Sequence, residues 1–148
     1  MNKRIVAIAS DHAGFHIKEK LISYLTREGV EVKDFGCYSE ESVDYPDFGH
    51  KLAFSVESRE CEIGISVCGS GNGINMTTNK HLGIRAALCW TEEISRLARA
   101  HNDANVCSIP GRFVSESEAI LIAHTFLNTP FDGGRHKRRI DKIPIKSM

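Results

Sequence analysis

Apolar residues recur along this chain in short runs rich in β-branched side chains, separated by longer stretches with helical spacing. The runs predict five strands, at Arg4–Ser10, Val30–Phe35, Glu62–Cys68, Ile84–Cys89 and Asn105–Ile109. Between the strands, apolar residues repeat every three or four positions, a spacing typical of amphipathic helices.

The predicted helices have recognisable ends. The first carries an apolar face from Ile17 to Leu25 and ends at Gly29, and the second begins near Pro46, which suits a first helical turn. The other three are Asn72–His81, Glu92–Ala100 and a helix that opens with a capping box at Ser115 and Glu118.

Strict alternation of strands and helices predicts an α/β fold, in which a parallel sheet carries helices on both faces. We expect a single-domain three-layer αβα sandwich over residues 1–148, with a five-stranded parallel sheet and a basic C-terminal helix or tail from about residue 133. Alternation alone leaves the strand order open. Ligands bind such sheets outside the carboxyl ends of the strands, so the residues after each strand are the first candidates for a site.

Composition narrows the functional classes. The chain has 148 residues, with 19 basic and 19 acidic side chains, so no overall charge attracts it to nucleic acid or to a membrane surface. The sequence shows neither a membrane-spanning stretch nor a signal peptide. Five cysteines without a CxxC pair suit reduced thiols in a cytoplasm better than disulfides or a structural zinc site.

The segment Cys68-Gly69-Ser70-Gly71-Asn72-Gly73-Ile74 joins a buried strand to a helix through alternate glycines. Its backbone N–H groups and helix N-terminus would favour an anion, and would lower the pKa of the Cys68 thiol. A packing role is the alternative for a cysteine at a strand end. Nucleotide binding is not supported, because Ile74 replaces the third glycine of a dinucleotide fingerprint and no P-loop Lys follows.

Two further segments follow strands. Asp11 and His12 come after the first strand, where Asp11 either caps the next helix or joins His12 and Cys68 at one sheet edge. After the second strand, the loop 36–45 is long enough to form a lid.

His101 and Asn102 end the fourth predicted helix, at the sheet edge opposite to Cys68. They either cap that helix or serve the site of a neighbouring subunit, which would require an oligomer, most simply a two-fold dimer. Near the C-terminus, Arg135 and Arg139 are spaced i, i+4. Both guanidinium groups would point the same way on a helix and suit a phosphate dianion, although a solvated basic face is the alternative.

Together these segments resemble one family, ribose-5-phosphate isomerase type B, a group that includes the allose-6-phosphate and galactose-6-phosphate isomerases. The resemblance rests on Ser10-Asp11-His12-Ala13-Gly14-Phe15, Asp44-Tyr45-Pro46, Cys68–Ile74, His101-Asn102-Asp103-Ala104-Asn105 and Gly133-Gly134-Arg135-His136. It covers essentially the whole chain. It implies a Rossmann-like sheet of flavodoxin-like strand order, no cofactor and no metal, and a homodimer with shared active sites, or a tetramer.

The resemblance also implies roles in catalysis. Cys68 would be the base that moves a proton between C1 and C2 of the open-chain sugar, and Ser70 would hydrogen-bond the reacting end. His101 and Asp11 would assist opening of the furanose ring. The other implied contacts are the backbone amides of Gly69, Gly71, Asn72 and Gly73 for the enediolate, Asn102 and Tyr45 for the sugar, and His12, Arg112, Arg135 and Arg139 for the phosphate.

Three other functions remain as alternatives. The same proton transfer on a six-carbon sugar phosphate is one, since the sequence does not show the length of the pocket. A non-catalytic sugar-phosphate sensor on this fold is the second. A redox thiol protein is disfavoured because Cys68 has no resolving cysteine nearby in the sequence.

Overall fold

The computed structural model describes residues 4–146. Five strands run in chain order: β1 (Ile5–Ser10), β2 (Glu31–Asp34), β3 (Ile63–Cys68), β4 (Ala86–Leu88) and β5 (Val106–Pro110). Six helices accompany them: α1 (Phe15–Arg27), α2 (Tyr45–Glu57), α3 (Asn72–Thr78), α4 (Glu92–Asn102), α5 (Glu116–Asn128) and α6 (Arg135–Ile140). Strand and helix alternate up to α5, as the hydrophobic pattern predicts.

All strand pairs are parallel, and the strand order is β2-β1-β3-β5-β4. The predicted α/β class with a five-stranded parallel sheet is therefore confirmed. The flavodoxin-like order implied by the resemblance is wrong on one side, because that order would be 2-1-3-4-5, whereas here β5 lies between β3 and β4. β3 lies in the middle of the sheet, where both of its faces are covered, so all of its residues are buried. Ser10 pairs with Val67, and Cys68 pairs with Pro110, so the ends of β1, β3 and β5 meet at one edge.

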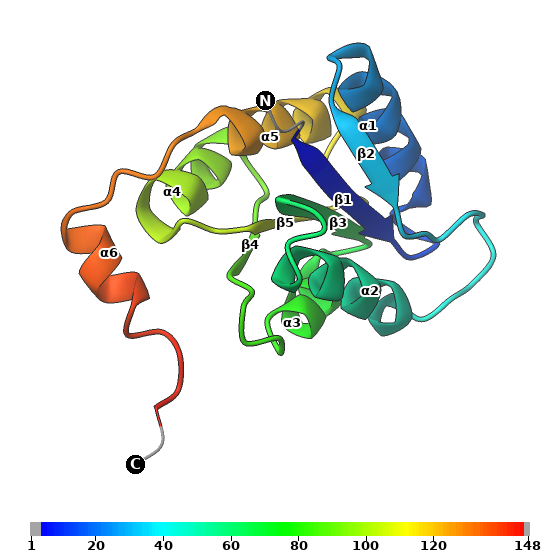
Figure 1. The fold of residues 1–148 in the computed structure, drawn as a ribbon. Helices are drawn as coiled ribbons and strands as arrows, with labels where there is room; N and C mark the ends of the chain where they lie inside the picture. Colours follow the sequence, from blue (N-terminus) through cyan, green and yellow to red (C-terminus); the bar gives the residue numbers. More distant parts are fainter. Residues whose placement is uncertain (1–3, 147–148) are drawn as a thin grey trace.

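Helices cover both faces of the sheet (Figure 1). On one face, α1, α4 and α5 pack against the larger apolar side chains of the strands, such as Ile8 and Ile65. The opposite face carries small residues and is covered by α2 and α3. A Cβ on Gly64 would lie 2.7 Å from Leu52 Cδ2, so the missing side chain lets α2 approach the sheet closely.

The element boundaries differ from prediction mainly at the sheet edges. β2 and β4 are the two edge strands, and they are shorter than the predicted Val30–Phe35 and Ile84–Cys89. Next to β4, the Asn79 side chain bonds both the N–H and the carbonyl of Ala86, so an amide side chain replaces a neighbouring strand. Within residues 4–146, the helices are too short or too polar to cross a membrane.

Candidate active site

Cys68 ends β3 at the carboxyl edge of the sheet, and its side chain is buried, with 4% exposed. The chain then turns sharply into α3 through Gly71, whose φ of +76° is left-handed. A Cβ at Gly71 would lie only 2.5 Å from Leu88 Cδ1. This position therefore requires glycine for both its backbone conformation and its space.

The electrostatics of Cys68 correct one expectation. Burial raises the pKa of the Cys68 thiol, and the Asp11 carboxylate also raises it, while the backbone N–H groups of Ile74, Gly71 and Gly73 act in the opposite direction. The net direction is upward, so the predicted lowering is wrong. The physical reason is that desolvation of a thiolate in this buried position outweighs the favourable amides at the start of α3.

Asp11 is not the N-cap of α1, because Gly14 holds that position without a side-chain cap hydrogen bond, so the capping interpretation is wrong. Its Oδ1 accepts a hydrogen bond of 3.0 Å from the Gly14 N–H, which closes the turn before α1. The same carboxylate is close enough to Cys68 to affect the thiol electrostatically. Gly14 is needed here, since a Cβ would lie 2.4 Å from the Val67 carbonyl oxygen.

Other predicted residues gather around the turn after β3. The Arg112 guanidinium lies over it, since a Cβ on Gly69 would be 3.2 Å from Arg112 Nη1. On the other side, the Tyr45 ring packs against the first turn of α3, where a Cβ on Gly73 would be 2.4 Å from Tyr45 Cζ. Within the turn, Ser70 Oγ accepts a hydrogen bond of 3.3 Å from the Asn72 N–H.

His12 is held by the loop 36–45. Its Nδ1 accepts a hydrogen bond of 3.2 Å from the Val43 N–H. A neutral His12 therefore carries its proton on Nε2, which becomes a donor.

Sequence reasoning missed the ion pair that anchors this loop. Lys18 is completely buried, and its Nζ bonds Asp34 at 2.8 and 2.9 Å and Glu19 at 3.1 Å. Asp34 Oδ1 also accepts from the Gly36 N–H, at the start of the loop. A signal was present, because Lys18 shares the apolar face of α1 with Leu21 and Leu25 at helical spacing.

The second group of predicted residues lies away from Cys68 in the same chain. α4 ends at the amino edge of the sheet, where Val106 pairs with Gly64, and His101 and Asn102 form its last turn. The four-residue rise from Gly64 to Cys68 corresponds to about 13 Å along β3. The chain therefore does not bring His101 or Asn102 to its own Cys68.

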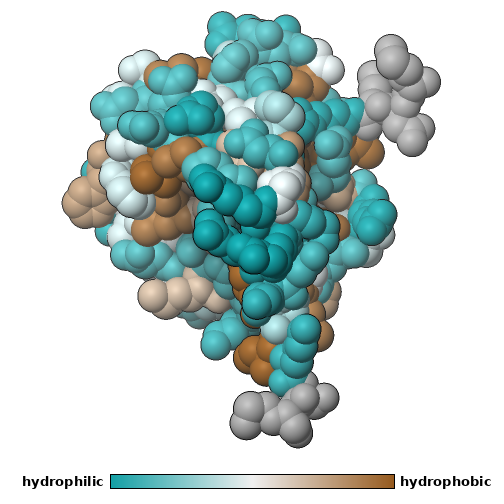
Figure 2. Space-filling model, turned by 90° about the vertical axis from the view of Figure 1, so that its left-hand side faces the viewer, coloured by the Kyte–Doolittle hydropathy of each residue, from teal (hydrophilic) through white to brown (hydrophobic). Residues whose placement is uncertain are grey.

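Arg135 and Arg139 lie on α6, which packs on α4 and projects from the rest of the molecule (Figure 1). Both side chains are exposed. Figure 2 views the molecule from this side and shows strongly hydrophilic side chains gathered across its centre. The chain thus has two separate groups of predicted site residues, one at the carboxyl ends of the strands and the other towards their amino ends.

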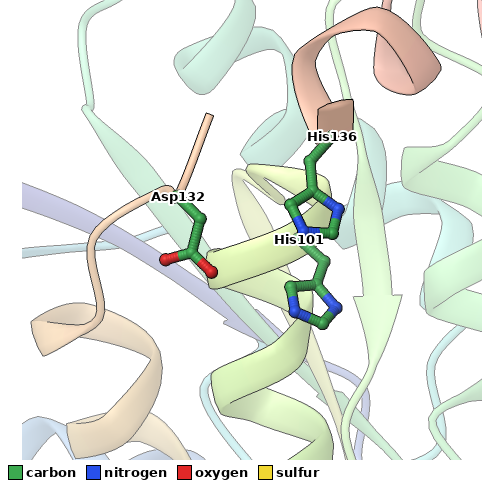
Figure 3. A group of neighbouring side chains, drawn as sticks. All are labelled: His101, Asp132 and His136. Atoms are coloured by element: carbon green, nitrogen blue, oxygen red, sulfur yellow. The ribbon is translucent and has the colours of Figure 1, made fainter. Parts of the chain in front are cut away.

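His101 has two neighbours that sequence reasoning did not assign. Its ring stacks on that of His136, with 4.2 Å between ring centroids and 11° between planes, and Asp132 lies beside both (Figure 3). Partial desolvation, followed by repulsion from His101 and Arg135, lowers the pKa of His136. The spacings of 31 and four residues match no common motif, so no signal in the sequence pointed to this cluster.

A cleft of about 940 Å³ also opens at the amino edge, lined in part by Arg85, Arg99 and Asp103. Asp103 pairs with both arginines, at 3.4 and 3.3 Å. These two arginines thus have an acidic partner within the chain, and the cleft shares no residue with the predicted site.

The fold defines an α/β protein with a five-stranded parallel sheet between two layers of helices. At the Cys68 end of this sheet, a thiol, a carboxylate and a guanidinium suit proton transfer on an anionic ligand. A sequence model of the Ribose/Galactose Isomerase family matches residues 6–143, and the chain belongs to this family.

Individual relatives agree. The chain is 38% identical over 138 residues to the ribose-5-phosphate isomerase B of Escherichia coli, covering 93% of each chain. It is 43% identical over 140 residues to a Mycoplasma genitalium protein described as a probable ribose-5-phosphate isomerase B, covering 93% of this chain and 92% of the relative. Other relatives, such as one from Rickettsia bellii at 38% identity, are described more broadly as sugar phosphate isomerases.

Solved structures show the same fold. A ribose 5-phosphate isomerase from Thermotoga maritima superposes with a TM-score of 0.94 at 52% identity, covering 97% of this chain and 99% of the other. The Mycoplasma genitalium ribose-5-phosphate isomerase B with bound ribulose 5-phosphate gives a TM-score of 0.92 at 41% identity, covering 97% and 95%.

Proposed function

We propose that this protein interconverts ribose 5-phosphate and ribulose 5-phosphate by proton transfer, without a cofactor. The observation that carries the proposal is Cys68 at the carboxyl edge of the sheet, buried beside Asp11 and faced by backbone N–H groups. Enolisation of a sugar phosphate needs a base that is shielded from solvent and hydrogen-bond donors that stabilise the enediolate oxygens. Family membership supports the same chemistry.

The Cys68 thiolate removes the proton from C2 of the open-chain aldose and forms an enediolate. The same sulfur returns the proton to C1, while a proton moves from the O2 hydroxyl to O1, which gives the ketose. The Ser70 hydroxyl donates a hydrogen bond to a sugar oxygen while its Oγ accepts one from the Asn72 N–H, so Asn72 acts through Ser70. The Gly69 N–H donates to the enediolate oxygens. Gly71 and Gly73 act differently from expectation in this proposal, since their N–H groups face the sulfur and stabilise the thiolate.

The phosphate of the substrate is bound by cationic and N–H donors. His12 offers its Nε2–H because the Val43 N–H occupies Nδ1. Arg112 lies beside Gly69, on the same edge as the thiol. Guanidinium groups suit phosphate because their planar N–H donors can bind two oxygens at once.

The site is completed by a second copy of the chain. His101 and Asn102 of the partner subunit assist ring opening and hold sugar oxygens, and Arg135 and Arg139 of the partner subunit add to the phosphate site. The support is geometric, since these residues lie at the opposite edge and their α6 projects outward with exposed guanidinium groups. A two-fold dimer would place each such arm over the other subunit's Cys68.

The five cysteines are all free and buried. Such thiols suit the reducing cytoplasm, where we place the protein.

Turnover tests the proposal. Purified protein with EDTA should convert ribose 5-phosphate to ribulose 5-phosphate, and Cys68→Ser should lower kcat by at least about 10²-fold, the lower range for loss of a general base. Ser is nearly isosteric, so circular dichroism of Cys68→Ser should match the wild type. Turnover of only six-carbon sugar phosphates would assign a different substrate, and binding without turnover would assign a sensor.

A further inference from the structure

We propose that His101, Asp132 and His136 form a binding site for a divalent transition-metal ion of the Zn²⁺ type, and that the bound ion inhibits the enzyme. The binding site stands on the structure alone. The inhibition rests on the proposed function, because it requires the ring of His101 for sugar-ring opening.

Three segments bring the ligand groups together. His101 comes from the last turn of α4, Asp132 from the linker after α5, and His136 from α6 (Figure 3). One ligand atom from each residue lies within 4.8 Å of the others. Two imidazoles and a carboxylate make a donor set that catalytic zinc sites use, with a fourth position left for water.

Local backbone contacts hold the three groups near one another. The Asp132 N–H donates a hydrogen bond of 2.9 Å to the carbonyl of Ala100, which ties the linker to α4 next to His101. Gly133 and Gly134 then turn the chain into α6 with φ values of +71° and +57°. The stacked rings add a third restraint on the position of His136.

The ligand groups have no other partner. Within residues 4–146, neither the two ring systems nor the Asp132 carboxylate makes a side-chain hydrogen bond, so three polar groups face one another unpaired. A second cluster of two histidines and a carboxylate differs on this point. There, His81 bonds His50 at 2.7 Å and Glu57 at 2.9 Å, so both of its ring nitrogens are occupied.

Ion binding requires only movement of side chains. Zinc–ligand distances of about 2.0–2.1 Å in a tetrahedron place ligand atoms about 3.3 Å apart, somewhat closer than the present limit of 4.8 Å. The parallel rings have to turn so that their lone pairs converge on the ion. Asp132 is exposed and both histidines are half-buried, so there is room for this rotation, which exchanges the stacking of the two rings for bonds to the ion.

Occupancy of the site would oppose the reaction. A ring nitrogen of His101 bonded to the ion can neither accept nor donate a proton. The reaction itself proceeds through Cys68 without a metal, so the ion supplies no compensating chemistry. We therefore expect the metal-bound protein to open sugar rings slowly.

Calorimetric titration with ZnCl₂ tests the site on the full-length protein without substrate. We expect one ion per chain, with affinity at least about 10-fold weaker in Asp132→Asn and in His136→Asn. His81→Asn is the matched control and should bind as the wild type does. Cys68→Ser should also bind normally, which separates this site from binding at a thiolate.

Activity assays then test inhibition. Zn²⁺ at concentrations that saturate the site should inhibit turnover of ribose 5-phosphate, EDTA should restore it, and His136→Asn should need at least about 10-fold more Zn²⁺. Unchanged Zn²⁺ affinity in His136→Asn, or its loss in His81→Asn or Cys68→Ser, would overturn the site. Binding without inhibition would overturn the inhibitory role. Absence of turnover in the metal-free protein would contradict the proposed function and leave the calorimetric result standing.

Discussion

The raised pKa of Cys68 determines how the reaction should depend on pH. An ordinary cysteine has a pKa of about 8.5 and is ionised to about 3% at pH 7. Burial and Asp11 raise the pKa of Cys68, so in the free enzyme the ionised fraction of this thiol at pH 7 is smaller than that of an ordinary cysteine. Because the thiolate is the base, kcat/KM should increase close to 10-fold for each unit of pH above 7, until the pH approaches the thiol pKa.

The choice of substrate separates this step from ring opening. Ribulose 5-phosphate cannot close a five-membered ring, because its C5 hydroxyl carries the phosphate, so assays from the ketose report enolisation directly. A sugar phosphate has its second pKa near 6, so the substrate is already a dianion throughout this range. The increase measured above pH 7 therefore belongs to the enzyme.

The assay is the initial rate of ribulose 5-phosphate consumption at low substrate concentration, from pH 7 to 9, in buffers of constant ionic strength. Cys68→Ser is the control, and its residual rate should not follow the same curve. A kcat/KM that stays constant between pH 7 and 8.5 in the wild-type protein would refute the reasoning, since it would mean that the base is already ionised at neutral pH.

Three further predictions concern stability. Gly71→Ala should lower the free energy of unfolding in urea by about 2–5 kcal/mol, because a left-handed alanine is strained and its Cβ would clash with Leu88. Gly29→Ala is the control, since Gly29 has a similar φ of +78° but open space around it, and it should lower the free energy of unfolding by only about 1–2 kcal/mol. Equal losses in the two variants would contradict this reasoning. Lys18→Met should lower the free energy of unfolding by about 1.5–3 kcal/mol, because it removes the hydrogen bonds of Lys18 to Asp34. It should also raise KM, because Asp34 anchors the loop whose Val43 N–H holds His12, and an unchanged KM would show that this loop does not connect Lys18 to substrate binding. Burial holds the pKa of the Cys107 thiol well above its ordinary value, so this thiol ionises first in the unfolded chain. Above about pH 8.5, Cys107 alone should lower the unfolding free energy by roughly 1.4 kcal/mol per pH unit, in addition to the fall caused by Cys68. Cys107→Ala should therefore show a shallower fall between about pH 8.5 and 9.5 than the wild type.

The sheet could be predicted from the sequence because its pattern is local. A β-branched run such as Glu62–Cys68 is buried on both faces only in a central parallel strand, and β3 has that position. The strand order could not be predicted, since the alternation of elements is compatible with several orders, and the flavodoxin-like order implied by the resemblance exchanges the positions of β4 and β5. The edge strands were predicted too long because partners such as the Asn79 side chain are not visible in a hydrophobic pattern.

The site could be predicted only in part. Residues that follow strands, such as Asp11 and Cys68, share an edge by topology, so their proximity could be inferred. The sign of the Cys68 pKa shift could not, because desolvation depends on the burial of the finished fold. Nor could the cluster of His101, Asp132 and His136, since three segments distant in sequence meet there through packing of α6 on α4.

Subunit mixing tests the shared Cys68 site most directly. Assayed from ribose 5-phosphate, whose ring has to open, Cys68→Ser and His101→Asn should each be nearly inactive, since each variant dimer lacks one essential group at both sites. When equal amounts are mixed and allowed to exchange subunits, half of the dimers are mixed and each has one intact site, so activity should recover to about a quarter of the wild-type level. A mixture that stays as inactive as its components after proven exchange would contradict a site built from Cys68 of one subunit and His101 of the other.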